Sequence, residues 1–279
     1  MYYKDKKVLL ATKHEKEKVI KPPFEQNLGC HIHVPDDYDT DQFGTFSGEI
    51  PRTASAYETL ILKAKKAAQA YAYQYCISSE GSFGPHPQIY FCPADTELMA
   101  FIDLENDLII MEYELTTKTN FNHIDIRAND NFEGFLKTVK FPSHGMIVRT
   151  LDSENEMIEK GIQEYTRLKE IIRKAFDYSS IIRLETDMRA MMNPLRMQVI
   201  GILAKKLVKR IQQRCPHCQT PGFGEVSTQG FLNCSYCGTQ TGLYKNQVLS
   251  CLKCEYKTYN KREDGKEFAE QSYCPHCNP

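Results

Sequence analysis

The amino-acid sequence has no long hydrophobic run and almost no net charge. None of its apolar stretches reaches the roughly 18 residues of a membrane-spanning helix, and the charged start Met-Tyr-Tyr-Lys-Asp-Lys-Lys lacks the apolar core of a signal peptide. Its 35 basic and 36 acidic side chains leave a formal charge of -1, so no overall field favours a polyanionic partner. We therefore expect a cytoplasmic protein without a membrane partner.

The sequence also lacks the short motifs of the common enzyme sites. It contains no G-x-G-x-x-G, Walker A, H-E-x-x-H or G-x-S-x-G segment. Any catalytic site must therefore be built from looser groups of polar residues. At 279 residues the chain exceeds one average domain, and we expect two or three domains.

What the chain does contain is a dense set of cysteines at its C-terminal end. Of its 11 cysteines, 8 stand in Cys-x-x-Cys pairs within the last 65 residues. The pairs are Cys215/Cys218, Cys234/Cys237, Cys251/Cys254 and Cys274/Cys277. Each turn aims two thiolates at one ion, and two turns complete the tetrahedral ligand set of a structural Zn²⁺. The sequence therefore predicts two structural zinc sites, with redox pairs or an iron-sulfur cluster as the alternatives.

Which pairs share an ion is a separate prediction. Between the first and second pairs lie 15 residues, and between the third and fourth lie 19, which leaves room for a short hairpin between paired turns. We expect two successive ribbons, in which the first pair binds with the second and the third with the fourth. The alternative is a cross-braced unit, in which the first pair binds with the third and the second with the fourth.

The apolar pattern divides the chain into three parts. Residues 1–144 alternate strand-like runs with helical patterns, which predicts an α/β domain, with a mixed α+β fold as the alternative. Residues 145–213 predict a βαβα segment ending in a long helix, and residues 214–279 predict the double zinc ribbon. The elements expected in the first part include a strand at 8–11, a helix broken by Pro22 and Pro23, a helix at 55–73, and a strand at 75–78 that ends in a loop at 79–87.

Two capping patterns position the helices of the middle segment. Ser153 and Glu156 form a capping-box pattern, so we expect an amphipathic helix over 153–176. Asn193 and Pro194 are typical of an N-cap and a first helical position. The long helix that they begin should end near the first cysteine pair.

Three groups of polar residues in the first part are candidates for chemistry. They are Thr12 and Lys13 after the first strand, Glu58 and Lys63 on the 55–73 helix, and Ser79, Glu80 and Ser82 after the 75–78 strand. Ligands of open α/β sheets gather at the carboxyl ends of strands, so we expect the first and third groups to face one cleft. Lysines and hydroxyls would hold phosphates there, and Glu58 and Glu80 would hold Mg²⁺. Solvated charges and ordinary turns are the alternative interpretation.

These groups belong to segments that resemble, in order and approximate spacing, the three signature segments of the inosine triphosphate pyrophosphatase superfamily. The segments are Val-Leu-Leu-Ala-Thr-Lys-His-Glu-Lys at 8–16, Glu-Thr-Leu-Ile-Leu-Lys-Ala-Lys at 58–65 and Ser-Ser-Glu-Gly-Ser-Phe-Gly at 78–84. The resemblance implies Mg²⁺-dependent hydrolysis of a nucleoside triphosphate to the monophosphate and pyrophosphate. It also implies phosphate contacts at Thr12 and Lys63 and metal binding by Glu58 and Glu80.

The chain departs from that superfamily at two positions. His14 stands where an asparagine is usual, and Ser79-Glu80 stands where two adjacent acids are common. The whole chain, including its zinc tail, also resembles a bacterial family known only as a domain of unknown function. That second resemblance implies no particular chemistry.

The densest polar motif lies between residues 183 and 196. Its sequence, Arg-Leu-Glu-Thr-Asp-Met-Arg-Ala-Met-Met-Asn-Pro-Leu-Arg, joins a strand to a helix N-terminus, where free backbone N–H groups attract anions. Arg189 and Arg196 can add bidentate contacts to a phosphate or carboxylate. Glu185 and Asp187 can bind a metal ion in such a site. The alternative is a structural ion-pair network, in which these two acids pair with the arginines.

The tail carries only a weak electrostatic signal for nucleic acid. From Lys205 to Pro279 there are 11 Lys/Arg and 6 Asp/Glu, and two Zn(Cys)₄ centres would remove four of the five excess positive charges. A local basic patch at Lys205, Lys206, Lys209 and Arg210 remains. We therefore hypothesise a zinc-binding protein that is a Mg²⁺-dependent nucleoside triphosphate phosphohydrolase. The alternative is a non-enzymatic module that binds a nucleic acid or a protein through its zinc ribbon.

Overall fold

The computed structural model describes residues 2–38, 55–152 and 157–279. They form two compact units. The larger unit comprises Tyr3–Asp107 and Met111–Leu207, and the smaller, which we call the cysteine unit, consists mainly of Val208–Pro279. Among the described residues, no helix is both long enough and apolar enough to cross a membrane.

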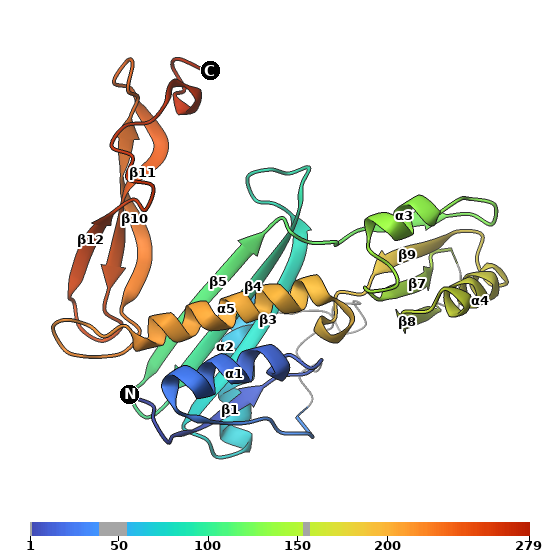
Figure 1. The fold of residues 1–279 in the computed structure, drawn as a ribbon, viewed down its shortest axis with the longest axis horizontal. Helices are drawn as coiled ribbons and strands as arrows, with labels where there is room; N and C mark the ends of the chain where they lie inside the picture. The colour runs from blue at the N-terminus through green and yellow to red at the C-terminus, as the bar shows by residue number, and fades with distance from the viewer. Residues whose placement is uncertain (1, 39–54, 153–156) are drawn as a thin grey trace. The chain divides into compact units, whose positions relative to one another are not determined.

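The larger unit combines two β-sheets with most of the helices (Figure 1). Its elements are β1 (Lys7–Ala11), α1 (Glu17–Leu28), β2 (His31–His33), α2 (Ala56–Ala70), β3 (Tyr75–Pro85), β4 (Pro93–Asp103), β5 (Leu108–Thr116), β6 (His123–Ile126), α3 (Glu133–Thr138), β7 (Met146–Thr150), β8 (Ile158–Ile162), α4 (Tyr165–Phe176), β9 (Ile182–Thr186), η2 (Ala190–Met192) and α5 (Pro194–Gln212). The first residues of β5 and the last of α5 group with the cysteine unit. This composition confirms the predicted mixture of helices and sheets.

The first sheet has the strand order β2-β1-β3-β4-β5. Strand β1 is parallel to β2 and β3, whereas β3 and β4 form a long antiparallel pair. The pairing of β1 with β3 ends at Ala11 and Ser78, while the pairing of β3 with β4 continues to Pro85 and Pro93. Beyond Ser78, β3 therefore has an edge that β1 no longer covers.

The first sheet has two faces that pack against different helices. Cys76 and Ile102 belong to one apolar cluster with Ala64 of α2. Their neighbours in sequence point to the opposite face, where the ring of Phe101 lies 6.4 Å from that of Phe24 in α1. We call these the α2 face and the α1 face. Helix α5 lies beside α1, since a Cβ at Gly201 would be 3.5 Å from Val19.

Helix α2 begins where its sequence predicts. Ser55 is the N-cap, its Oγ accepts a hydrogen bond from the backbone N–H of Glu58 at 3.2 Å, and the Glu58 carboxylate accepts one from the backbone N–H of Ser55 at 2.9 Å. This reciprocal capping box satisfies two of the N–H groups that a helix start leaves free.

Two expectations for the first part were wrong. Residues 79–85 continue β3 instead of forming a loop, because their backbone pairs with β4 throughout. Pro22 and Pro23 do not break the helix but lie inside α1. Each proline removes one helical hydrogen bond, and the burial of Pro23, Phe24 and Leu28 offsets that loss.

The second sheet corrects the expected middle segment. Its strand order is β6-β9-β7-β8, and the cluster that includes Val148, Leu168 and Leu184 forms its core with α3 and α4. The helix expected over 153–176 begins only at Tyr165, because residues 158–162 form β8 and pair with β7. Ser153 and Glu156 lie outside the described residues. The division of the sequence at residues 144 and 213 stays a prediction.

The cysteine unit is built on a three-stranded antiparallel sheet. Its elements are β10 (Gly224–Asn233), β11 (Gln240–Ser250), β12 (Lys257–Lys261) and η3 (Gln271–Tyr273). The long β10–β11 hairpin pairs Gly224 with Ser250 at one end and Asn233 with Gln240 at the other. Strand β12 pairs with β11 alone.

Candidate functional site

Eight cysteines of the cysteine unit form two four-sulfur clusters. One contains Cys215, Cys218, Cys251 and Cys254, and the other contains Cys234, Cys237, Cys274 and Cys277. In each cluster all four sulfur atoms lie within 4.8 Å of one another. Sulfur contacts of 3.5 to 4.0 Å across the clusters match the separation of about 3.8 Å that tetrahedral ligands with Zn–S bonds of about 2.3 Å require. The two predicted zinc sites therefore fit the structure.

The pairing is cross-braced, so the expected succession of two ribbons was wrong. The first cysteine pair joins the third, and the second joins the fourth. The hairpin explains this result, because it brings the end of β11, and with it Cys251, beside the start of β10 and the turn at Cys215. At the other end, a bridge between Cys234 and Ala269 brings the final segment to the second pair.

The first turn of each cluster has the same supporting hydroxyl. The Thr220 hydroxyl lies 3.2 Å from Cys218 Sγ, and the Thr239 hydroxyl lies 3.2 Å from Cys237 Sγ. Hydrogen bonding to these threonines lowers the pKa of Cys218 to about 6 and that of Cys237 to about 5. These hydrogen bonds therefore favour the thiolate form of Cys218 and Cys237, the form that a metal ion requires.

The basic patch expected near the start of the tail is partly engaged. Lys206, which belongs to the larger unit, forms ion pairs with Glu112 at 3.5 Å and Glu114 at 3.7 Å. Arg210 Nε donates a hydrogen bond to the backbone oxygen of Gly222 at 3.3 Å. Nucleic-acid or protein binding through this segment stays a prediction.

A cluster of buried charged residues occupies the first sheet of the larger unit. Its members, all at most 8% exposed, are Lys16, Lys63, Glu80, Asp95, Glu97 and Arg196. Three are cations and three are carboxyl groups, and charged groups are rarely buried unless they are paired. The cluster combines residues from β3, β4, α2, α5 and the turn before α1, and we call it the charged cluster.

On the α2 face, Lys63 forms hydrogen bonds with the second half of β3. Its Nζ donates hydrogen bonds to the Ser79 backbone oxygen at 2.5 Å and to the Glu80 carboxylate. Strand alternation puts Glu80 on the same face as Ser78, whose Oγ bonds the Leu60 backbone oxygen of α2. Lys63 and Glu80, both singled out from the sequence, are thus brought together as a buried ion pair.

On the α1 face, Lys16 and Arg196 approach β3 and β4. Lys16 Nζ donates to Ser79 Oγ at 3.2 Å, and Arg196 Nε donates to Glu97 Oε1 at 2.6 Å. The Arg196 guanidinium also lies over the ring of Phe83, 5.1 Å from its centroid. The two halves of the cluster meet around the uncovered edge of β3, since Ser79 contacts a lysine through each of its two oxygens.

Burial shifts two ionisations in the cluster. Desolvation, followed by the charges of Arg196 and Lys63, lowers the pKa of Lys16 to about 7. Desolvation, followed by the charge of Glu97, raises the pKa of Asp95 to about 8. Perturbed ionisations of this kind gather at functional sites, although structural networks also produce them.

The turn between β1 and α1 is strained next to the cluster. His14 and Glu15, which are not glycines, both adopt positive φ angles, of 64° and 62°. Such conformations cost roughly 1–3 kcal/mol each and concentrate at binding and catalytic sites. Helix α1 follows directly with Lys16 as its N-cap and no side-chain cap. Backbone hydrogen bonds from Lys18 N–H to the Glu15 oxygen at 3.2 Å and from Val19 N–H to the Lys16 oxygen at 3.1 Å close its first turn.

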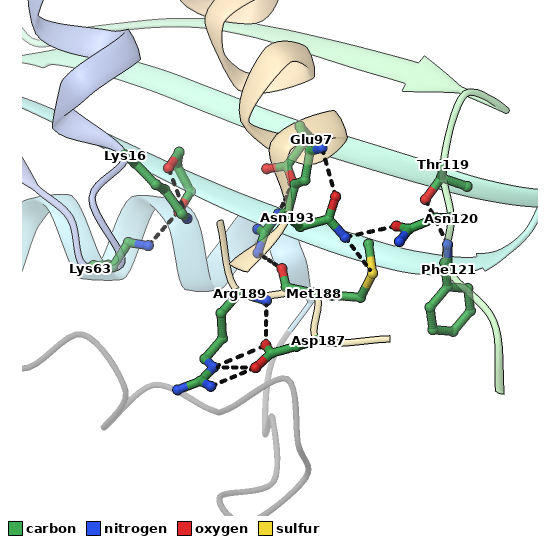
Figure 2. Close-up of polar contacts among 12 residues, drawn as sticks. Lys16, Lys63, Glu97, Thr119, Asn120, Phe121, Asp187, Met188, Arg189 and Asn193 are labelled. Atoms are coloured by element: carbon green, nitrogen blue, oxygen red, sulfur yellow. Dashed lines mark hydrogen bonds and ion pairs between the residues drawn. The ribbon is translucent and has the colours of Figure 1, made fainter. Parts of the chain in front are cut away.

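Polar contacts of the 183–196 motif lie both within the motif and to other segments (Figure 2). Arg189 Nε donates to Asp187 Oδ1 at 3.0 Å, so this pair forms the predicted structural ion pair. Asn193 caps α5 as expected, because its Oδ1 accepts the N–H of Arg196 at 3.1 Å. Its amide nitrogen donates to Asn120 Oδ1 at 2.8 Å. The motif therefore caps the start of α5 and places Arg196, in the first turn of that helix, in the charged cluster.

Other residues proposed from the sequence lie apart from these contacts. Glu58 is exposed and bonds to Ser55 as part of the capping box. Ser82 is exposed, Lys13 is half-buried, and Thr12 is buried with its hydroxyl directed to the Lys13 backbone oxygen at 3.3 Å. Their roles in phosphate or metal binding stay predictions.

Three members of the cluster escaped the sequence reasoning. Lys16 looks like one of several surface lysines in a charged segment, but the fold buries it against Ser79 of β3. Asp95 and Glu97 stand two residues apart just before the apolar run Leu-Met-Ala-Phe-Ile. That spacing places both on one face of a strand, and it is the signal that identifies them.

The absence of a side chain at Gly81 permits the Arg196–Glu97 contact. A Cβ there would lie 2.5 Å from Arg196 Nη2 and 2.5 Å from Glu97 Oε1. We expect Gly81→Ala to lower the free energy of unfolding by about 1–3 kcal/mol, measured by urea denaturation followed by far-UV circular dichroism. Gly84→Ala on the same strand is the matched control, since no atom lies within 4 Å of its new Cβ. Equal effects of the two substitutions would contradict this account.

Comparison with known proteins gives a family but no activity. No curated protein matches the sequence. A family model described as "Domain of unknown function (DUF6671)" matches residues 63–279, which include Lys63, the rest of the charged cluster except Lys16, and all eight zinc-site cysteines. The resemblance to the inosine triphosphate pyrophosphatase superfamily stays a prediction. The chain belongs to the family of the domain of unknown function DUF6671.

Proposed function

We propose that the larger unit is a Mg²⁺-dependent hydrolase of nucleoside triphosphates that releases the monophosphate and pyrophosphate. In this reaction a water oxygen forms a bond to the α-phosphorus. The bond from that phosphorus to the oxygen bridging the β-phosphate breaks, and pyrophosphate leaves with that oxygen and its electron pair. The water proton that is displaced passes to solvent. Mg²⁺, when bound, would neutralise charge on the phosphates.

The observation that carries this proposal is the environment of Lys16. Lys16 is 6% exposed. Its ammonium group has three N–H donors, one of which donates to Ser79 Oγ. A buried lysine with a neutral partner is costly, and a phosphate oxygen is the ligand that offsets this cost. The strained turn at His14 and Glu15 lies directly before this lysine.

The rest of the charged cluster supports the same substrate class. Lys63 and Arg196 add two cations, and both are oriented by carboxylates, Glu80 and Glu97 respectively. Preorganised cations in a site without water stabilise negative charge that develops on a transferring phosphoryl group. We assign Lys16 and Lys63 to contacts with the phosphates, and Glu80 to the positioning of Lys63.

Removing the ammonium of Lys16 costs its hydrogen bond to Ser79 Oγ but also relieves the penalty of burying the charge. A lysine whose pKa falls from 10.5 to about 7 on folding destabilises the folded state. Under the linkage relation that penalty is fully present below pH 7 and disappears as the pH rises towards 10.5. Lys16→Met should therefore lower kcat/KM at pH 7 by at least about 100-fold, while its Tm at pH 7 is no lower than that of the wild type.

The experiment measures pyrophosphate release from a panel of nucleoside triphosphates with and without Mg²⁺. Lys18→Met is the matched control, because that lysine is exposed and pairs with Glu15 on the surface; its turnover should equal that of the wild type. Glu80→Gln, which removes the charge that orients Lys63, should also lose turnover. Absence of Mg²⁺-dependent turnover in the wild type, or equal turnover in Lys16→Met, would refute the proposal.

A further inference from the structure

We infer that Asp95 and Glu97 of β4 are the carboxylate ligands of a divalent cation on the α1 face of the first sheet. The two residues are separated by one position, so their side chains project from the same face of the strand. They pair in register with Phe83 and Gly81 of β3. Neither residue was a candidate from the sequence, and neither faces α2 as Glu80 does.

Both carboxyl groups are buried and incompletely bonded. Asp95 is 1% exposed and Glu97 is 0% exposed. Asp95 Oδ1 and Glu97 Oε2 accept no hydrogen bond. A buried polar atom without a partner costs roughly 1–3 kcal/mol, and two such oxygens lie on adjacent positions of the same face. This arrangement calls for a ligand that binds both oxygens.

The described hydrogen bonds of the neighbouring cations go to other atoms. Arg196 Nε is bonded to the other oxygen of Glu97, at 2.6 Å, and Arg196 Nη1 donates to the Met188 backbone oxygen. Lys16 Nζ donates to Ser79. Carboxylate oxygens are suitable ligands for hard cations such as Mg²⁺ and Mn²⁺, and Mg²⁺ sites commonly combine one or two carboxylates with water and substrate phosphates.

This inference deepens the proposed function, and the phosphate part of it rests on that function. The two carboxylates lie on the face where Lys16 and Arg196 converge. A polyphosphate bound by these cations would complete the coordination of the cation, so ion and nucleotide should strengthen each other's binding. The superfamily resemblance assigns the metal to Glu58 and Glu80 instead. The described contacts of Glu58 are with Ser55 and those of Glu80 are with Lys63, and none of them joins the two acids.

Binding of the ion can be measured without turnover. We would titrate full-length, zinc-loaded protein with Mn²⁺ and follow the electron paramagnetic resonance signal of the free ion, with and without a nucleotide analogue carrying a methylene group between the α- and β-phosphates. The inference predicts one Mn²⁺ per chain beyond the zinc. Asp95→Asn should weaken its binding by at least about 10-fold, and Glu114→Gln on β5 is the matched control, which should bind as the wild type does.

The outcomes separate this inference from the proposed function. If Asp95→Asn loses Mn²⁺ binding and Glu114→Gln keeps it, the result supports the site even where no nucleotide is hydrolysed. Turnover that survives in Asp95→Asn with unchanged Mn²⁺ affinity would leave the proposed function standing and overturn the site. Absence of Mn²⁺ binding to the wild type, with or without the analogue, would mean that the two carboxyls only share a proton, which overturns the inference. Asp95→Asn is preferred to Glu97→Gln, because the latter also unpairs Arg196.

Discussion

A chelator at neutral pH should remove two zinc ions from each chain and unfold the cysteine unit while the larger unit keeps its sheets. The cysteine unit has a small core: its cysteine-rich cluster holds Phe223 with Cys215 and Cys251, and Leu249 and Cys254 pack against it. A structural zinc ion contributes about 10–16 kcal/mol of apparent binding energy in small zinc domains. The sheets of the larger unit contain separate apolar clusters that no cysteine pair completes.

Two measurements test this expectation. Elemental analysis counts the zinc, and hydrogen exchange with mass spectrometry locates the unfolding. Exchange should accelerate in β10 and β11 and remain slow in β3 and β4, and added zinc should restore the protection. Zinc content well below two per chain before chelation, or protection of β10 and β11 that persists without metal, would contradict the structural role of the ions.

Paired serine substitutions test the cross-braced arrangement. Cys215 and Cys251 share one cluster, so replacing both with serine should leave one ion per chain. Cys215 and Cys234 belong to different clusters, so replacing both should weaken both sites. Two successive ribbons would give the opposite pair of results.

Arg196→Met should produce the largest loss of stability in the larger unit, about 3–5 kcal/mol in the free energy of unfolding. The ion pair between Arg196 Nε and Glu97 Oε1 has no solvent exposure on either side chain. Removing the arginine leaves the Glu97 charge buried without this partner, and burial of an unpaired charge is strongly unfavourable. Urea denaturation followed by far-UV circular dichroism measures the change.

Two companion variants identify the cause. The double variant Arg196→Met/Glu97→Leu should recover much of the lost stability, because buried ion pairs replaced on both sides are often neutral. Arg149→Met removes a partly exposed pair with Glu185 at 3.0 Å, and its effect should be below about 1 kcal/mol. A loss in Arg196→Met as small as that in Arg149→Met would show that the pair is not what anchors α5 to the sheet.

Local patterns predicted those elements whose ends carry their own signals. Ser55 with Glu58 marks the start of α2, and Asn193 marks the start of α5. The second half of β3 has no such signal, because its serines and glycines are typical of a loop. It is a strand only because β4 supplies the hydrogen-bonding partner along its whole length. Its conformation is fixed by pairing with residues that are distant in sequence.

The candidate site was predictable to a similar extent. Lys63 and Glu80 were found through their segments, and the structure brings them together. The sequence did not identify Lys16, Asp95 and Glu97. The burial of a charged residue depends on the segments that pack over it, and the local sequence does not indicate it. The pairing of the cysteines was missed for a related reason: spacing limits which turns form, while a hairpin decides which turns meet.

The position of the two cysteine clusters at opposite ends of one hairpin also governs when the protein can acquire its metal. Each cluster takes two ligands that precede β11 in the sequence and two that follow it. The last ligands of the two clusters are Cys254 and Cys277. During synthesis from the N-terminus, a ribbon built from the first two pairs would have been complete at Cys237. In the cross-braced arrangement, neither ion has its full ligand set until both strands of the hairpin have been made, so complete zinc coordination follows synthesis of the hairpin.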